Sequence, residues 1–280
     1  MLIYTKIADL RGFLKEIKSL NQSVGFVPTM GALHNGHISL IEASKKACNI
    51  TICCIFVNPT QFNDKADLER YPRMPEKDAE FLKNAGCHAL FMPTVSEVYP
   101  NTTTENFDFD FLDKTLEGKH RPGHFNGVAQ VVKRLFEIVE PTKAFFGEKD
   151  FQQVMIVKAL VKQMGSEIEI ISCPILREAD GLAMSSRNAL LTKNEREIAG
   201  LVPKIMNAAK KLIHENGIAE AKLFIQKEVA KISIMKLDYF EVCNAENLKT
   251  VTDVNSTKTA IALIAIYVGK IRLIDNLPIN

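Results

Sequence analysis

The chain has 280 residues, of which 46% are hydrophobic and 24% charged, and its formal net charge is +2. This length allows one or two domains with a large core, and the small net charge excludes a strong general attraction to nucleic acid or to an acidic membrane surface. Six cysteines include no C-x-x-C pair, so we expect buried reduced thiols and neither a zinc site nor a disulfide framework. The N-terminus lacks a signal-peptide pattern, and the longest apolar run, 260–268, is about half of a membrane span, so we expect a cytoplasmic protein without a membrane segment.

Apolar positions recur at helical spacing in several segments, with short apolar runs between them. The expected helices are 7–20, 36–47, 75–85, 128–139, a segment from the turn at 147–150 to about 164, 194–214 and 218–232. The expected strands are 24–28, 49–57, 88–92, 101–112, 143–146, 168–173, 236–243, 259–268 and 270–274. Residues 101–112 alternate in part between phenylalanine and aspartate and are expected to form an edge or antiparallel strand, followed by a mobile basic loop at 113–127.

Strands and helices alternate in the first part of the chain, and the strand expected at 49–57 is continuously apolar. This pattern is typical of a parallel sheet that helices cover on both faces. The predicted fold class is therefore α/β, with a Rossmann-like doubly wound sheet in a nucleotide-binding and catalytic domain, 1–175. Residues 176–280 are predicted to form a smaller C-terminal α+β domain that closes over the site.

A strand, a turn of small residues and a helix meet at residues 28–37, P-T-M-G-A-L-H-N-G-H. The plain interpretation is that His34 and His37 are polar residues that cap a helix. The functional interpretation is a phosphate site, because a helix N-terminus presents unpaired N–H groups and imidazoles can stabilise charge on phosphate oxygens. Gly36 would let the backbone approach a ligand closely. The combination of strand, turn and H-x-G-H favours the phosphate site.

Four further groups carry polar side chains that suit a nucleotide or a small acid. The turn 147–150, G-E-K-D, and the segment 184–187, M-S-S-R, suit a nucleotide, since hydroxyls and a guanidinium can clamp a triphosphate. Carboxamides at Asn58 and Gln61 follow a buried strand, where ligands bind in open α/β sheets. The loop 121–124, R-P-G-H, is either a ligand site or a solvated basic loop, and of the adjacent Gln152 and Gln153 at most one should reach a pocket.

Six motifs occur in order at 28–37, 56–62, 71–73, 121–128, 146–153 and 177–188. On these motifs, which span nearly the whole chain, the sequence resembles the pantothenate synthetase (pantoate–β-alanine ligase) family of the H-x-G-H nucleotidyltransferase superfamily. The resemblance implies an AMP-forming ligase that condenses (R)-pantoate with β-alanine through a pantoyl adenylate. It also implies ATP as a substrate, Mg²⁺ on the phosphates, a homodimer, and no nucleic-acid or membrane partner.

The resemblance also implies roles for individual residues. His34 and His37 would be catalytic, with His37 at the position of the family's proton donor. The residues implied to contact ATP are Met30, Gly31, Ala32, Leu33, His34, Asn35, Gly36, His37, Gly147, Glu148, Lys149, Asp150, Leu176, Met184, Ser185, Ser186 and Arg187. Gln61 and Gln153 would hold pantoate, and Asn58, Arg121 and His124 would face pantoate or β-alanine. Asp78 would help to hold Mg²⁺ through the phosphates.

Two other function classes stay open on the residues alone. The H-x-G-H turn allows an adenylyl- or cytidylyltransferase that stops after nucleotidyl transfer, and it also allows a regulatory nucleotide-binding module. The paired carboxamides and the basic loop favour an acyl-acceptor step, and the several cationic groups favour catalysis over simple binding. One departure from the family is Ala66-Asp67-Leu68, which keeps one acid where the family has an acidic pair.

Overall fold

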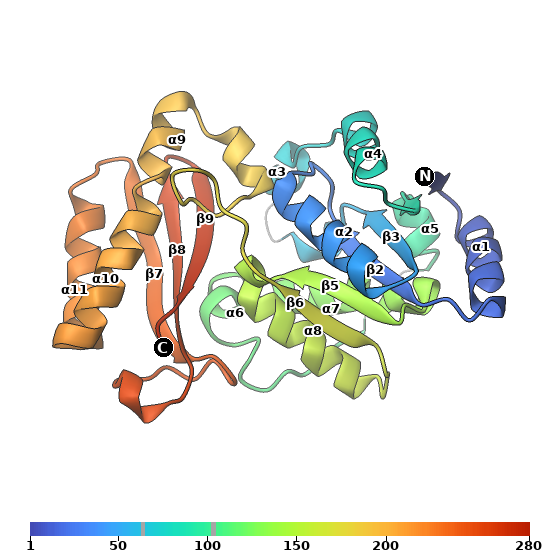
Figure 1. The fold of residues 1–280 in the computed structure, drawn as a ribbon. Coiled ribbons are helices and arrows are strands. Elements are labelled where there is room, and N and C mark those ends of the chain that lie inside the picture. The colour runs from blue at the N-terminus through green and yellow to red at the C-terminus, as the bar shows by residue number, and fades with distance from the viewer. Residues whose placement is uncertain (63–64, 102–104) are drawn as a thin grey trace. The chain divides into compact units, whose positions relative to one another are not determined.

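The protein, seen here as a computed structural model, is described over residues 1–62, 65–101 and 105–280, without the side chains of 65–67. The chain divides into two compact units, Met1–Pro174 and Ile175–Asn280 (Figure 1). The boundary predicted from the sequence lies one residue away from this division. The departure from the family's acidic pair at Ala66-Asp67 concerns side chains that lie outside the described part.

Strands and helices alternate in the first unit. The strands are β1 (Leu2–Tyr4), β2 (Val24–Thr29), β3 (Ile50–Ile55), β4 (Ala89–Phe91), β5 (Lys143–Gly147) and β6 (Glu169–Cys173). The helices are α1 (Ile7–Ser19), α2 (Asn35–Ala47), α3 (Lys65–Arg70), α4 (Pro75–Asn84), α5 (Val95–Val98), α6 (Leu116–His120), α7 (His124–Val139) and α8 (Phe151–Gln163), with 3₁₀ turns η1 (Pro59–Gln61) and η2 (Glu148–Asp150). The strands pair in parallel in the order β1-β4-β3-β2-β5-β6, which confirms the predicted doubly wound sheet.

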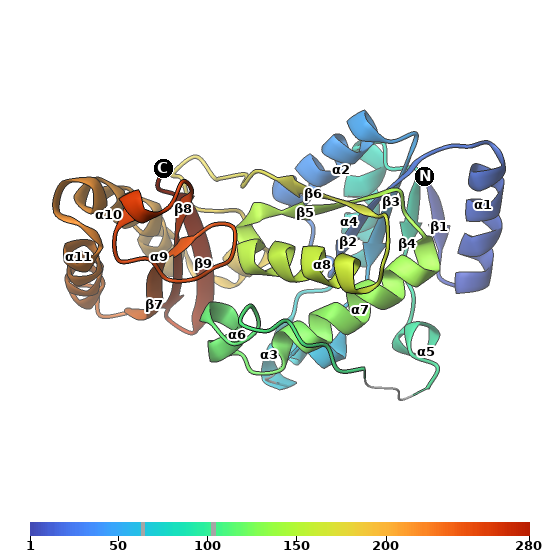
Figure 2. The same cartoon turned by 90° about the horizontal axis from the view of Figure 1, so that it is seen from below.

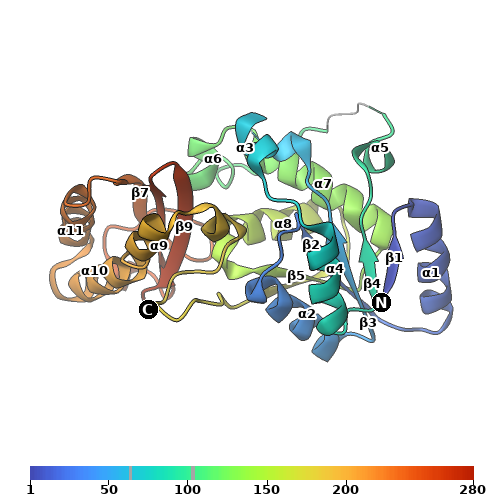
Figure 3. The same ribbon diagram turned by 90° about the horizontal axis from the view of Figure 1, so that it is seen from above.

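Helices cover both faces of this sheet. One face packs against α1, α7 and α8, which are seen from below in Figure 2, and the other against α2 and α4, seen from above in Figure 3. Because neighbouring residues of a strand point to opposite faces, Phe26 lies in the first of these cores and Val27 in the second. Burial on both sides explains why the strands read as continuous apolar runs.

The order in which successive strands are added to the sheet reverses between the parallel neighbours β2 and β5. From β2 the chain continues to β3 on one side, whereas β5 is followed by β6 on the other. In open α/β sheets a ligand binds at this reversal, beyond the carboxyl ends of the strands. Here those ends are Thr29, which leads to the histidine turn, and Gly147, which leads to η2. The fold thus brings two of the predicted nucleotide segments to one edge of one sheet.

The predicted strand at 101–112 is wrong for the described residues 105–112, which form an irregular segment that ends in turns. No neighbouring strand pairs with it in the described part of the unit. Phe109 is buried in the core beside Phe107, and Asp108 accepts the N–H of Asp110, which has a φ of 54°. The alternation therefore reflects aromatic side chains that pack on the core around an aspartate turn, and not a sheet edge.

The basic loop predicted at 113–127 is also shorter than expected, because α6 and the first turn of α7 lie within it. α7 begins at His124, four residues before the predicted start at Val128. Gly123 precedes the helix with a φ of 80°, a conformation that glycine adopts at little cost. His124 is consequently held by a helix and is not part of a mobile loop.

The second unit is a smaller α+β fold, as predicted. Its strands β7 (Met235–Asn244), β8 (Ala260–Val268) and β9 (Ile271–Pro278) form an antiparallel sheet. Its other elements are α9 (Lys193–Ala199), α10 (Val202–Asn216), α11 (Ile218–Ala230), η3 (Ser186–Leu190) and η4 (Val254–Ser256). The helix predicted at 194–214 is two helices, because Pro203 has no N–H to continue the hydrogen bonding and stands in the first turn of α10.

All six cysteines are free and buried, as the sequence predicts. Burial raises the pKa of the Cys54 thiol and raises that of Cys87 to about 11, so both stay protonated near neutral pH. Among the described residues, no helix combines the length and the apolar character needed to cross a membrane.

Candidate active site

The N-terminus of α2 is capped by the two histidines of the H-x-G-H turn. The Nδ1 atom of His34 accepts the N–H of Gly36 at 3.1 Å, and Nδ1 of His37 accepts the N–H of His34 at 3.3 Å. The two rings lie 4.0 Å apart between centroids. The expectation that the backbone amides of this turn are unpaired is therefore wrong for His34 and Gly36, whose N–H groups are bonded to imidazoles.

These contacts fix the tautomer of both imidazoles. Because each Nδ1 accepts a hydrogen bond, it carries no proton, and the neutral ring must carry its proton on Nε2. Burial, followed by the positive charge of Lys149, lowers the pKa of His34 to about 4, although Asp150 opposes this. Burial, His34 and Lys149 hold the pKa of His37 well below its usual value. The turn thus presents two neutral Nε2–H donors near pH 7.

The segment after β5 places a cation close to these rings. Lys149 is in η2, and its Nζ lies 3.2 Å from Oδ1 of Asp150. The Lys149 side chain is mostly buried, whereas that of Asp150 is half exposed. Since Lys149 lowers the pKa of both His34 and His37, its charge acts on the same space as the two imidazoles. An anion bound there would be attracted by all three groups.

Asp78 lies on α4 and reaches the histidine turn from the side. Its Oδ2 accepts the N–H of Ala32 at 2.9 Å, and its Oδ1 accepts the N–H of Leu33 at 2.7 Å. The Leu33 side chain itself is buried in the core below α2. Two amides that the resemblance assigns to ATP are therefore already bonded within the protein. No sequence pattern indicates this contact, which joins residues about 45 positions apart.

Asn58 organises the short turn η1 that carries Gln61. Its side chain is fully buried, and both Nδ2 hydrogens are used, with Oε1 of Gln61 at 3.3 Å and the carbonyl of Gly127 at 3.1 Å. Its Oδ1 accepts the Thr60 N–H and the hydroxyl of Tyr99. Asn58 is thus placed to support Gln61, and the predicted direct contact with a substrate stays a prediction.

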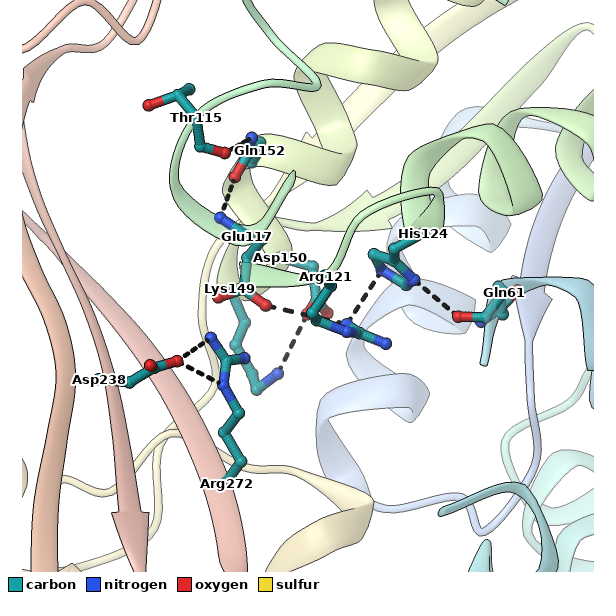
Figure 4. Close-up of polar contacts among 10 residues, drawn as sticks. All are labelled: Gln61, Thr115, Glu117, Arg121, His124, Lys149, Asp150, Gln152, Asp238 and Arg272. Carbon is teal, nitrogen blue, oxygen red and sulfur yellow. Dashed lines mark hydrogen bonds and ion pairs between the residues drawn. The ribbon is translucent and has the colours of Figure 1, made fainter. Parts of the chain in front are cut away.

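Gln61, His124 and Arg121 form a chain of contacts (Figure 4). The Nδ1 of His124 lies 2.9 Å from the carbonyl oxygen of Gln61, and its Nε2 lies 3.0 Å from an Arg121 nitrogen. A carbonyl only accepts and a guanidinium only donates, so the His124 proton is on Nδ1. Burial and the Arg121 charge lower the pKa of His124 to about 4. His124 thereby links the Gln61 backbone to the Arg121 guanidinium.

The two neighbouring glutamines of α8 have different surroundings. Gln152 is buried, and its Nε2 donates to the carbonyls of Leu112 and Thr115, whereas its Oε1 accepts the N–H of Glu117. Figure 4 shows this side chain turned toward the segment before α6. Gln153 is half-buried, and its carboxamide makes no hydrogen bond to another described residue. Of the pair, Gln153 is the one whose carboxamide remains available to a ligand.

Acid is expected to destabilise the protein through His124. Its pKa is about 4 when folded and about 6.5 when unfolded, so between these values the unfolded chain binds more protons. The stabilising contribution of neutral His124 is therefore present in full above about pH 6.5. As the pH falls toward 4, the free energy of unfolding decreases by about 3 kcal/mol. Urea unfolding at pH 7, 5.5 and 4.5 measures this loss. His124→Asn keeps an N–H donor but cannot titrate, and its loss should be smaller; an equal loss contradicts the assignment.

Gly127→Ala is expected to disturb the turn that carries Gln61. A Cβ at this position of α7 would lie 2.7 Å from the carbonyl carbon of Thr60 and 2.8 Å from Cα of Gln61. Both neighbours are backbone, so α7 and η1 would have to separate, at a cost of about 1–3 kcal/mol. Thermal unfolding measures this cost. Gly12→Ala is the matched control, because a Cβ in that helix meets no atom within 4 Å and should stabilise the protein slightly.

In the second unit, residues just before the predicted nucleotide segment 184–187 form two ion pairs. Ser185 caps η3 by accepting the N–H of Arg187 at 3.2 Å, and Met184 donates its N–H to the carbonyl of Leu176 at 3.0 Å. The Leu176 side chain is 40% exposed. Arg177, at the start of the motif 177–188, pairs with Asp275 through both of its terminal nitrogens. The sequence motif contained Arg177, but only the fold identifies its partner.

Asp180 forms the second of these pairs, with Arg196 of α9. Both Asp180 oxygens accept from Arg196, at 2.6 and 3.1 Å, and one also accepts the N–H of Leu182. Asn188 closes the segment by donating to the carbonyl of Ala183 at 3.1 Å. These contacts explain why polar residues that do not suit a ligand recur within the motif 177–188. They hold the backbone on which Ser185, Ser186 and Arg187 are mounted.

The described residues do not form a protein cage for Mg²⁺. No group of three or more histidine, cysteine, aspartate or glutamate side chains is placed to share an ion in the described part of the chain. The predicted ligand Asp78 uses one lone pair on each oxygen for a backbone amide. Mg²⁺ commonly takes only one or two carboxylates and is otherwise bound by phosphate oxygens and water. The single carboxylate of Asp78 therefore fits a Mg²⁺ ion that enters the site already bound to a triphosphate.

Comparison with known proteins gives one consistent result. The family model described as pantoate-beta-alanine ligase matches residues 2–278. Proteins named pantothenate synthetase are 46% identical in Porphyromonas gingivalis, over 99% of each chain, and 43% identical in Bacteroides fragilis, over 99% of this chain and 98% of that one. The crystal structure of pantothenate synthetase from Thermus thermophilus is 37% identical, with a TM-score of 0.93, and covers 100% of this chain and 99% of that one.

A second solved structure was determined with ligands. It is the pantoate-beta-alanine ligase of Francisella tularensis, described as complexed with beta-gamma ATP and beta-alanine. It is 36% identical to this chain, with a TM-score of 0.85, and the match covers 99% of this chain and 97% of that one. With a family model and close relatives that both extend over almost the entire sequence, the chain belongs to the pantoate–β-alanine ligase family.

Proposed function

We propose that the protein catalyses the ATP-dependent condensation of (R)-pantoate with β-alanine, releasing AMP and pyrophosphate. The observation that carries this proposal is the pair of Nε2–H donors on His34 and His37, joined by the Lys149 cation where the strand order reverses. The Francisella ligase, described with beta-gamma ATP and beta-alanine bound, supports ATP and β-alanine as substrates. The reaction has two steps in one site.

In the first step, a carboxylate oxygen of pantoate attacks the α-phosphorus of ATP, and the bond to pyrophosphate breaks. Negative charge then grows on the phosphate oxygens. His34 and His37 donate hydrogen bonds to these oxygens, and Lys149 offsets the charge. Because both imidazoles are neutral before ATP binds, their Nε2–H groups are donors without the cost of burying two extra cations. No protein side chain forms a covalent bond.

In the second step, the neutral amine of β-alanine attacks the acyl carbon of pantoyl adenylate, and AMP leaves with the electrons of the broken C–O bond. The amine proton passes to solvent. Gln61 and Gln153 are proposed to orient the pantoate hydroxyls, since carboxamides both donate and accept. Arg121, held by His124, is proposed to pair with a substrate carboxylate. Positioning of this kind supplies much of the acceleration in reactions between bound partners.

The second unit is proposed to contribute Leu176, Met184, Ser185, Ser186 and Arg187 to ATP binding and to close over the site. A guanidinium binds phosphate through two parallel N–H bonds, which suits Arg187 to this role. Mg²⁺, when bound with the nucleotide, would reduce the charge of the phosphates and orient them. The exposed Leu176 side chain is available for contact with the adenine ring.

The test is the release of AMP and pyrophosphate by the purified protein. Release of AMP should require pantoate and β-alanine together, and mass spectrometry should identify the amide. Pyrophosphate exchange into ATP should need pantoate alone, because the first step precedes the amine. A nucleotide conjugate released as the final product would overturn the ligase assignment in favour of a nucleotidyltransferase. ATP binding without exchange would indicate a binding module.

A cytoplasmic location and a homodimer are also proposed. Six buried free thiols suit a reducing compartment and support the first proposal. The homodimer rests on the family resemblance, and light scattering of the purified protein tests it, with a monomeric mass as the contradicting result.

A further inference from the structure

We propose that Asp78 is a positioning residue, whose carboxylate serves as an internal anion that holds the histidine turn in its binding conformation. This inference rests on the proposed function, in which that turn binds the phosphates of ATP. Asp78 is only 2% exposed, although it lies in the first turn of a surface helix, α4. Its own N–H is bonded to the carbonyl of Met74 at 2.8 Å, so the helix holds its backbone in place.

The turn that Asp78 contacts has an unusual backbone. Gly31 and Ala32 follow one another with φ values of 82° and 50°, both in the left-handed region. Glycine adopts this region readily, but alanine does so only with strain. Successive backbone N–H groups in a turn can converge and form a concave site that binds an anion. Here the N–H groups of Ala32 and Leu33 converge on the two oxygens of Asp78.

The contact is close on all sides. Gly31, the residue before the anion site, has little room for a side chain, because a Cβ would lie 3.0 Å from Oδ2 of Asp78 and 3.1 Å from the Ile55 side chain. Thr29 supports the same turn: its hydroxyl donates to the carbonyl of Cys54 and accepts the N–H of Gly31 at 3.3 Å. The turn is thus held from β3 and from α4 at once.

Two consequences distinguish this role from that of a metal ligand. First, the amides of Ala32 and Leu33 are occupied by Asp78, so in the proposed function Nε2 of His34 and His37, and not these two amides, contact the phosphates. Second, removing the carboxylate should release the left-handed pair Gly31-Ala32, and with it the start of α2. The binding of Mg²⁺ itself should then be little changed, since the ion arrives on the triphosphate.

The first experiment measures backbone amide exchange in the ligand-free protein, and it needs no activity. Asp78→Asn keeps the shape of the side chain but can accept only one of the two N–H groups without opposing donors. We expect exchange at Ala32 and Leu33 to become at least tenfold faster, with the amides of β3 unchanged. Glu80→Gln is the matched control, because it removes the same charge from α4 at a position that does not contact the turn, and it should leave the turn unchanged.

The second experiment measures steady-state kinetics as a function of Mg²⁺. Asp78→Asn should lower kcat/KM for ATP at least tenfold, while the Mg²⁺ concentration for half-maximal rate stays within twofold of the wild-type value. Unchanged exchange at Ala32 and Leu33 would overturn the inference, and so would a shift of Mg²⁺ half-saturation of fivefold or more that excess Mg²⁺ reverses. If the wild-type protein forms no pantothenate, the proposed function fails, but the exchange experiment still decides the role of Asp78.

Discussion

His37→Asn is expected to lower kcat by about two to three orders of magnitude with little change in stability. Asparagine can place an oxygen near the position of Nδ1, and so can still accept the N–H of His34 that caps α2. It cannot place a donor at the position of Nε2, which in the proposed mechanism stabilises charge on the α-phosphate. Loss of one such donor typically costs about 10²–10³ in kcat. Initial rates of pyrophosphate release under saturating substrates measure the effect.

Two further variants separate chemistry from folding. His37→Gln carries an amide donor near the position of Nε2 and should recover part of kcat. His88→Asn is the matched control, because the Nδ1 of His88 likewise accepts a backbone N–H, from Thr51 at 3.0 Å, but just before β4, at the amino ends of the strands. Its kcat should be close to that of the wild type. If His37→Asn retained wild-type turnover, the imidazole would have only the structural role of a cap.

The strand and helix pattern of the first unit could be predicted because its physical causes are local. Strands buried on both faces need continuous apolar runs, and the short turn at 28–37 follows directly from such a run. The failure at 105–112 has the same origin, since Phe107 and Phe109 are apolar for packing and not for strand pairing. A pattern of apolar residues predicts which side chains are buried. The same residues form a strand only where a neighbouring strand is present to pair with them.

The support of the site could not be predicted, because it depends on contacts between distant positions. Asp78 reads as an ordinary acid in the first turn of a helix, a position that the helix dipole favours. Only the fold shows that its oxygens meet two backbone amides from the histidine turn. Asn58 likewise reads as a ligand after a strand, whereas its carboxamide is used within the protein. Sequence motifs predicted the segments of a site, but not which of their residues support the others through contacts within the protein.

Asp275→Ala is expected to destabilise the protein by about 3–5 kcal/mol, the largest effect on stability among the variants considered. Asp275 is 5% exposed, and its two oxygens accept from Arg177 at 2.8 and 3.0 Å. The same guanidinium donates to the carbonyls of Gly181 and Asn276. Removing the carboxylate leaves the partly buried Arg177 charge without its counter-ion, and the segment 177–188 loses its ion pair with β9. Urea unfolding and the KM for ATP measure the two consequences.

A double variant shows whether the cost comes from the unpaired charge. Arg177→Met with Asp275→Leu removes both partners, so it should be less destabilising than Asp275→Ala alone, because no buried charge remains. Glu228→Ala is the control for an exposed pair, with Lys231 on the surface of the same unit, and should cost less than about 1 kcal/mol. If the double variant proved as unstable as the single one, the ion pair would matter for its packing and not for its charge. If stability recovered while the KM for ATP stayed high, the pair would serve chiefly to shape the segment that carries Ser185, Ser186 and Arg187.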